Sequence, residues 1–214
     1  IEPNPKIKSK HNVKVIKGLF DSNFEISDNV DAIIHSHFLE HVYEPLETIR
    51  NISKKIKENT LHFFSVPRFD EMLKRKYTNC INFEHTIFLS EKHIDYMLKL
   101  CGFKILEKQY FQDDHSIFYT TKKTNEQIKY ESVPNLYQKH KIMFHSFIQF
   151  YLELIKKLNK RIQLHDGPVY LFGGHIFSQY LLRFGLDESK IECILDNDPN
   201  KQGKRLSGSS LIVN

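Results

Sequence analysis

Short apolar runs alternate with helical patterns along the first two-thirds of the chain. The segments 13–18, 31–36 and 60–67 contain β-branched or aromatic residues and end at glycine, serine or proline, which predicts three strands. The apolar centre of 31–36 is typical of a buried parallel strand. Two later runs, 103–111 and 116–122, lie so close together in sequence that we expect an antiparallel pair.

Helical spacing separates these strands. Apolar residues recur every three to four positions over 45–57, which begins with a proline suited to the first turn of a helix. A second helix is predicted over 90–100, with its end marked by Gly102. After a polar linker, 123–135, a broad apolar stripe predicts a long helix over 136–162.

The last third repeats the alternation on a smaller scale. The segments 168–174 and 190–199 are predicted strands, and 176–185 between them is a predicted helix that ends at glycine. Strands that alternate with helices favour a parallel, doubly wound sheet. The sequence therefore predicts an α/β fold with two Rossmann-like lobes, the second smaller than the first, joined by the long helix.

This alternation implies a domain organisation. We expect the main domain over 1–123, the linker and long helix over 124–162, and the small α/β domain over 163–214. A nucleotide-binding lobe needs a Gly-rich strand–turn–helix before its first acidic residue, and none precedes Glu2 here. We therefore expect a longer natural protein, and we expect 211–213 to begin a further strand.

Composition excludes several functional classes. Among 214 residues, 31 Lys and Arg against 26 Asp and Glu give a net charge of +5, without the basic stripe that favours nucleic-acid binding. No apolar run reaches the ~18 residues of a membrane span. Three separated cysteines, Cys80, Cys101 and Cys193, favour thiols in a reducing compartment. We expect a cytoplasmic protein that binds neither nucleic-acid polymers nor membranes.

A group of histidines directly follows the strand predicted over 31–36. His35, His37 and His41 fall within seven residues, and ligands bind at the carboxyl ends of strands in open sheets. The stretch from His37 to His41 also fits the H-x-x-E-H pattern of zinc peptidases. That pattern needs a sustained helix, whereas Pro45 follows four residues later, so we expect no metal. A loop that lines a cofactor or substrate and a helix start with a packed histidine remain as alternatives.

Other acidic and histidine residues fall in loops beside the predicted strands. Glu2 suits the acid that accepts hydrogen bonds from a ribose diol, although a surface glutamate is the alternative. Glu84 and His85 suit an orienting carboxylate and a general base. His115 lies in a segment, 113–116, that is either a further functional loop or a polar turn.

A glycine turn in the last third imitates part of a dinucleotide-binding fingerprint. Gly173 and Gly174 follow a predicted strand, and Asp196 follows the next one. The full G-x-G-x-x-G is missing because Phe177 and Ser178 occupy its later positions. A tight turn without a ligand is therefore an equally good interpretation.

Taken in order, these segments resemble the S-adenosylmethionine-dependent methyltransferases. DAIIHSHFLEHVYEPLETI resembles that family's fourth strand, LHFFSVP its fifth, and EHTIFLSEKHIDYMLKLCGFKILE the helix and strand that follow. The last part of the chain is similar to the C-terminal domain of sugar C-methyltransferases. The matched positions of its D-x-x-P-x-K-Q-G…G stretch are Asp196, Pro199, Lys201, Gln202, Gly203 and Gly208.

The resemblance implies a Rossmann-like methyltransferase sheet, a cofactor and a substrate. It implies S-adenosylmethionine as the methyl donor, held by Glu2, Phe20, Asp21, Ser36 and His37, and a nucleotide-activated sugar as the acceptor. The family's glycine loop and its N-terminal four-cysteine zinc domain are not in this chain. We therefore expect the chain alone to bind the cofactor weakly and to be inactive.

The resemblance also implies catalytic roles. His85, with Glu84, matches the family's base, which removes a proton next to a ketone, while His41 and His115 match groups that would stabilise the enolate. Asn82 stands where the family has a tyrosine, which leaves the methylated atom open. An O-methyltransferase acting on a sugar or small molecule, and a non-catalytic subunit that binds a nucleotide sugar or a partner, are the alternatives.

Overall fold

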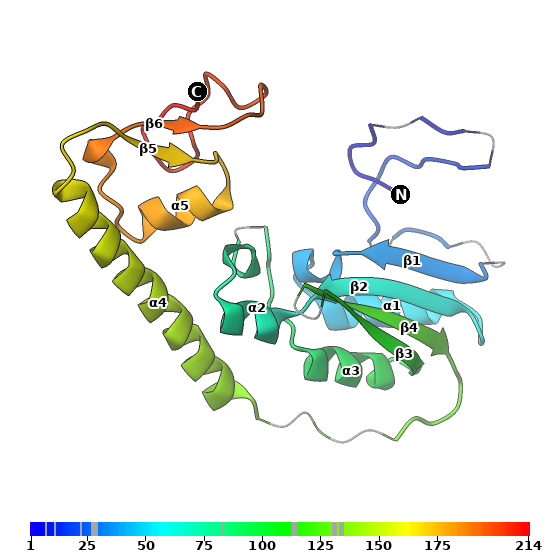
Figure 1. Cartoon of the computed structure of the whole chain (residues 1–214). Coiled ribbons are helices and arrows are strands. Elements are labelled where there is room, and N and C mark those ends of the chain that lie inside the picture. Colours follow the sequence, from blue (N-terminus) through cyan, green and yellow to red (C-terminus); the bar gives the residue numbers. More distant parts are fainter. Residues whose placement is uncertain are drawn as a thin grey trace. The chain divides into compact units, whose positions relative to one another are not determined.

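The computed structural model forms two compact units (Figure 1). The first unit comprises Ile1–Arg68 and His85–Val133, and the second comprises Phe69–Glu84 and Pro134–Asn214. Segment 69–84 therefore groups with the later part of the chain, whereas we expected it within a domain over 1–123. The residues that the structure describes are 1–6, 8–10, 12–21, 23–26, 30–82, 84–112, 115–129, 132 and 135–214.

Strands and helices alternate in the order that the sequence predicts, with one addition, α2, and one omission, the strand predicted over 13–18. The strands and α-helices are β1 (Ala32–Ser36), α1 (Pro45–Lys55), β2 (Leu61–Pro67), α2 (Phe69–Arg75), α3 (Glu91–Leu100), β3 (Phe103–Phe111), β4 (Ser116–Lys123), α4 (Tyr137–Gln163), β5 (Val169–Phe172), α5 (Ile176–Arg183) and β6 (Ile191–Leu195). Short 3₁₀ turns lie at η1 (Leu39–His41), η2 (Thr78–Cys80) and η3 (Glu188–Lys190).

The sheet of the first unit is mixed rather than fully parallel. Its strand order is β1-β2-β4-β3, with β1 and β2 parallel and the other two pairs antiparallel. The antiparallel pairing of β3 with β4 is as predicted. Because β4 returns directly from β3 and inserts beside β2, it also runs antiparallel to β2, which the expectation of a parallel sheet did not include. The predicted α/β fold class is confirmed.

Helices α1 and α3 cover one face of this sheet (Figure 1). Ile49 and Ile52 of α1 pack in one core with Ile94 of α3 and with Phe64 and Tyr119 of the sheet. Burial of this apolar surface is the main source of stability for the unit. The parallel register places the carboxyl ends of β1 and β2 at the same edge of the sheet, which brings the loops after them together.

The second unit contains the predicted β–turn–α–β arrangement. Strands β5 and β6 are parallel, and side chains such as Leu181 of α5, Ile194 of β6 and Ile155 of α4 share one core. The segment 211–213, expected to begin a strand, pairs with β6 through a parallel bridge between Ile194 and Val213.

Two predictions about secondary structure are wrong. The segment 13–18 forms no strand but only single bridges, from Val13 to Lys10 and from Lys17 to Glu2, because it has no continuous partner strand among the described residues. Helix α2 lies in a segment for which the sequence pattern predicted neither a helix nor a strand. Its Met72 packs with Phe147 and Tyr151 of α4 in a separate core, and seven residues are too few for a clear helical period.

The three cysteines carry buried thiols and not disulfides, as predicted. Among the described residues, no helix combines the length and the apolar character that crossing a membrane requires.

Candidate functional site

The chain turns sharply where β1 ends. His37 adopts a left-handed backbone conformation, with φ of 47°, which is uncommon for a residue with a side chain and often marks a functional site. The turn is fixed to β2, since the His37 N–H donates to the Ser65 carbonyl at 3.0 Å. The hydroxyls of Ser36 and Ser65 lie 2.7 Å apart. This turn directs the His37 side chain toward Glu40, three residues later.

Glu40 is the centre of a polar network at this edge of the sheet. The residue is only 4% exposed. Its Oε1 lies 3.0 Å from His37 Nδ1, and His37 Nε2 lies 3.0 Å from the Ser116 hydroxyl, which in turn lies 2.6 Å from His115 Nδ1. A neutral His37 that donates from Nδ1 accepts at Nε2, so Ser116 donates to His37 and accepts from His115.

A backbone hydrogen bond next to His85 holds this residue close to Glu40. The Thr86 N–H donates to the Glu40 carbonyl at 2.9 Å, and the Thr86 hydroxyl donates to the Val42 carbonyl at 2.8 Å. The rings of His41 and His85 consequently lie 5.1 Å apart, at 70° to each other. One ligand-type atom from each of Glu40, His41 and His85 lies within 4.8 Å of the others.

We call this arrangement the Glu40 cluster. It brings together four histidines that the sequence singled out from three separate segments of the chain, together with a buried carboxylate and a serine. Its members are Glu40, His37, His41, His85, His115 and Ser116.

Sequence reasoning missed the central role of Glu40. Glu84, the carboxylate that we expected to orient His85, belongs to the second unit, and its N–H donates to the Asn82 side chain at 2.6 Å. The catalytic role of Glu84 stays a prediction. The signal for Glu40 was its position three residues after His37 in the H-x-x-E-H stretch, which places the two side chains on one side of a single turn.

His35 is a packed histidine that pairs with His62 of β2. Its Nε2 lies 2.9 Å from Nε2 of His62, which is completely buried. Burial lowers the pKa of His35 to about 4, and it also lowers the pKa of His62. Both rings are therefore neutral at pH 7, and one donates to the other. The interpretation of a packed histidine holds for His35 but not for its neighbours His37 and His41.

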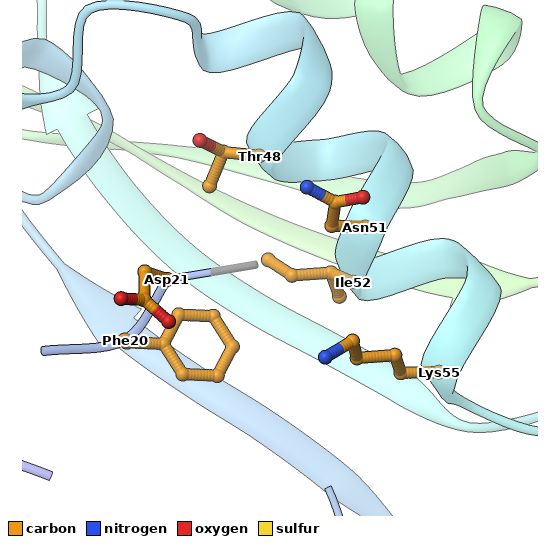
Figure 2. A pocket seen from close by; sticks show the side chains of 6 residues that line it. All are labelled: Phe20, Asp21, Thr48, Asn51, Ile52 and Lys55. Carbon is orange, nitrogen blue, oxygen red and sulfur yellow. The ribbon is translucent and has the colours of Figure 1, made fainter. Parts of the chain in front are cut away.

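Phe20 and Asp21, expected to bind the cofactor, line a small pocket against α1 (Figure 2). The pocket holds about 30 Å³, about the volume of one water molecule, so in this form it does not admit a nucleoside. The Asp21 carboxylate accepts a hydrogen bond from the Asn23 N–H at 2.9 Å. A cofactor role for these two residues stays a prediction. The remaining lining residues are Thr48, Asn51, Ile52 and Lys55.

Ser36, another expected cofactor residue, lines a larger hollow on the sheet. The hollow holds about 210 Å³ and is also lined by Ile34 of β1, Ser65 of β2 and Phe118 of β4. Ile34 is 76% exposed and Phe118 46%, so this part of the sheet presents apolar surface beside a hydroxyl. Those are the chemical features that a nucleoside base and ribose require.

Glu2, which we expected to accept hydrogen bonds from a ribose diol, lies in no named strand. It is exposed, and its backbone pairs with the segment 16–18 through its N–H to the Ile16 carbonyl at 3.0 Å and its carbonyl to the Gly18 N–H at 3.2 Å. The reason is that β1 pairs with β2 and, among the described residues, with no named strand on its other side. The carboxylate still carries acceptors suited to hydroxyl groups.

The glycine turn of the second unit is closed by its own side chains. Asp196 accepts hydrogen bonds from the Gly174 N–H at 2.7 Å, the Asp198 N–H at 2.9 Å and the Lys201 ammonium at 3.0 Å. These bonds, led by the one from the Asp198 backbone, hold the pKa of Asp196 down at about 2. A carboxylate of the chain thus takes the place that a bound anion has in a dinucleotide fold.

Comparisons with known proteins bear on the first unit. Residues 2–108, half of the chain, match a family model described as a methyltransferase domain. No curated protein matches the chain. Similar solved structures include a proposed S-adenosylmethionine-dependent methyltransferase from Listeria monocytogenes, at 10% identity over 55% of this chain and 73% of that chain, with a TM-score of 0.44.

This chain covers a smaller share of two further structures. One is an S-adenosylmethionine-dependent methyltransferase from Clostridium acetobutylicum, with 13% identity over 52% of this chain and 65% of that chain and a TM-score of 0.42. The other is magnesium protoporphyrin IX methyltransferase from Synechocystis with bound SAH, with 14% identity over 48% of each chain and a TM-score of 0.36. The chain spans less than two-thirds of both. On the family match over residues 2–108, the chain belongs to the methyltransferase domain family.

Proposed function

We propose that the protein transfers the methyl group of S-adenosylmethionine to a carbon atom of a nucleotide-activated sugar, with His85 as the general base. Membership of the methyltransferase domain family supports methyl transfer. The observation that carries the proposal is the Glu40 cluster, in which His85 and His41 face one another beside a buried carboxylate at the end of a parallel strand. The sugar and the carbon atom rest on the sequence resemblance.

Two side chains of the first unit suit this cofactor. Ser36 offers a hydroxyl beside an apolar hollow, and the exposed carboxylate of Glu2 offers acceptors for ribose hydroxyls. When bound, S-adenosylmethionine supplies an electrophilic methyl group on a sulfonium. The protein must therefore make an atom of the acceptor nucleophilic, and the side chains of the Glu40 cluster are placed to do this.

A sugar carbon becomes nucleophilic only after it loses a proton next to a ketone. An imidazole is the side chain whose ordinary pKa best suits that transfer near neutral pH, and His85 is half-buried and so remains within reach of a substrate. The proton converts the His85 ring to a cation, which the nearby Glu40 carboxylate stabilises. His41 is exposed beside it and is placed to donate a hydrogen bond to the enolate oxygen.

Replacement of His85 by Gln tests the proposal. The variant keeps a hydrogen-bonding side chain but has no base. In the full-length protein, methyl transfer from labelled S-adenosylmethionine to a panel of nucleoside-diphosphate keto-sugars is therefore expected to fall by about 10²–10⁴-fold. Exchange of the substrate hydrogen next to the ketone with deuterated solvent is expected to fall with it, because that step needs the same base. Binding of S-adenosylmethionine is expected to stay unchanged.

His145→Gln is the matched control, because His145 is an exposed histidine of α4 in the second unit. It is expected to leave both rates unchanged. Wild-type exchange in His85→Gln would show that another group is the base. Methyl transfer without any exchange in the wild-type protein would indicate transfer to oxygen instead of carbon.

A further inference from the structure

We propose that Glu40, His41 and His85 form a binding site for a divalent transition-metal ion, with Zn²⁺ as the best match. The H-x-x-E-H stretch led us to expect no metal, because it cannot form the long helix that the peptidase site needs. The structure places a different trio together. His37 bonds to Glu40 and is not one of the three. His85, which follows η2 in the chain, lies with Glu40 and His41 instead.

The spacing of the three ligand-type atoms fits one ion. They lie within 4.8 Å of one another, while Zn²⁺ binds nitrogen and oxygen ligands at about 2.0–2.2 Å. Two ligands of one ion are therefore separated by at most about 4 Å, so the site closes with small side-chain rotations. The exposed side chain of His41 has room for such a rotation. Among the described residues, no other trio of such side chains meets this spacing.

The second observation is an unsatisfied oxygen. Glu40 is 4% exposed, and its Oε2 is fully buried without a hydrogen-bond partner among the described residues. A buried carboxylate oxygen without a partner is costly. The Glu40 carboxylate belongs to the trio with two imidazole rings, and a cation between them would satisfy it.

The surroundings of Glu40 have the form that metal sites use. Its other oxygen, Oε1, is held by His37 at 3.0 Å, and His37 is held by Ser116 at 3.0 Å. Such an outer layer of hydrogen bonds orients a carboxylate ligand. Two imidazoles and one carboxylate favour Zn²⁺ over Mg²⁺ or Ca²⁺, which prefer oxygen ligands alone. Three protein ligands with one of them exposed leave a position open.

The consequence for catalysis rests on the proposed role of His85. A ring nitrogen that binds a metal ion has no lone pair left to accept a proton, so metal binding and proton abstraction by His85 exclude each other. Zn²⁺ at this site therefore switches the base off. The existence of the metal site does not depend on that role.

Titration of the chelator-stripped chain with ZnCl₂, against a chromophoric zinc indicator, tests the site. The wild-type chain is expected to bind one Zn²⁺. Glu40→Gln and His41→Asn each remove a ligand, so each is expected to weaken binding by more than the roughly 10–100-fold that loss of an outer-layer partner causes. His145→Asn, the same change at a distant exposed histidine, is expected to bind like wild type.

Two results would overturn the site. One is a wild-type chain that does not bind Zn²⁺ stoichiometrically. The other is equal binding by wild type, Glu40→Gln and His41→Asn. Circular dichroism checks that each variant is folded. If Glu40→Gln does not fold, His41→Asn alone decides whether the site exists, because a change at the exposed His41 is not expected to disturb the fold. This titration contains neither S-adenosylmethionine nor acceptor, so its failure leaves the proposed function intact.

A second measurement tests the switch. Hydrogen exchange of the keto-sugar by the wild-type protein is expected to stop at one equivalent of Zn²⁺ and to return after addition of EDTA. Undiminished exchange with the ion bound would overturn the link between the site and the base. Loss of exchange in His85→Gln without Zn²⁺ reports on the proposed function alone.

Discussion

The two units use the same turn after a parallel strand in opposite ways. In each, the residue directly after the strand has a positive φ, 47° at His37 after β1 and 93° at Gly173 after β5. In the second unit, Asp196 accepts hydrogen bonds from the Gly174 N–H and from Lys201, so polar groups of the loop are paired with one another. In the first unit, the Glu40 carboxylate keeps one buried oxygen without a partner among the described residues.

The two turns differ in backbone strain and in whether their buried polar groups have partners among the described residues. A glycine adopts a positive φ without a steric penalty, so the turn at Gly173 is unstrained. A histidine there carries strain, and strain of this kind persists at functional sites. We therefore expect a ligand at the loop after β1 and none at the loop after β5.

The largest expected effect is a difference in acid stability between the units. His35 and His62 are held neutral as a pair in the sheet of the first unit, with the pKa of His35 lowered by burial to about 4, against 6.5 in an unfolded chain. Because the unfolded chain binds more protons between these values, the free energy of unfolding falls as the pH falls from 6.5 to 4. The loss from His35 alone is about 3 kcal/mol.

Peptide-resolved hydrogen exchange at pH 7 and pH 4.5 measures this difference. Strands β1 and β2 are expected to lose protection first. Asp196 in the second unit has its pKa lowered from 3.8 to about 2, so its contribution is present above pH 3.8 and is lost only as the pH falls toward 2. Equal loss of protection in both units at pH 4.5 would contradict the comparison.

Glu40→Gln is expected to separate activity from stability. The amide keeps the size of the side chain and an acceptor for His37, but it removes the charge beside His85. Methyl transfer is expected to fall by roughly 10–100-fold, a part of what general-base catalysis supplies. The melting temperature is not expected to fall, because the change removes a buried charge that is only partly compensated. A purely structural role would lower the melting temperature and leave the rate of the folded enzyme unchanged.

Asp196→Asn is expected to weaken the local structure of the second unit without a change in methyl transfer. The neutral amide accepts weaker hydrogen bonds from Gly174, Asp198 and Lys201 than the carboxylate does. Exchange of the Gly174 and Asp198 amide hydrogens is expected to rise roughly tenfold, as NMR exchange rates would show. Methyl transfer is expected to be unchanged. A loss of methyl transfer with unaltered amide exchange would place Asp196 in a functional site instead.

Gly173→Ala is expected to have the smallest effect. The added Cβ forces a side chain into a left-handed backbone conformation with φ of 93°, at a cost of about 1 kcal/mol. For a chain of this size that lowers the melting temperature by roughly 2–4 °C, measurable by calorimetry. Gly18→Ala is the control, because Gly18 has open space around it and no positive φ. A similar shift in both variants would contradict a special requirement at Gly173.

The parts of the fold that the sequence predicted are those set by local pattern. Helices α1 and α4 are long enough for a clear apolar period. Strands β3 and β4 are separated by only four residues, so their pairing could be predicted from the sequence. Helix α2 is too short for such a period. The segment 13–18 has the composition of a strand, but a strand exists only where a partner is available, and composition does not reveal the partner.

The candidate site was predicted residue by residue but not as an arrangement. His37, His41, His85 and His115 were all chosen from the sequence, while Glu40 was overlooked as their common neighbour. The contact that brings His85 to the others is made by main-chain atoms of Thr86 and Glu40, 46 positions apart. Backbone hydrogen bonds of this kind leave no trace in residue types or spacing.

That same tie has a consequence for how the protein can be altered. The loops that carry His41 and His85 are held together largely by main-chain carbonyls of Glu40 and Val42, with Thr86 as the donor. We therefore expect the loops to keep these two main-chain contacts when the imidazoles are exchanged for other side chains. A library that randomises positions 41 and 85 but retains Thr86 would explore new acceptors on an unchanged scaffold, and substitution of Thr86 would be the change that such engineering must avoid.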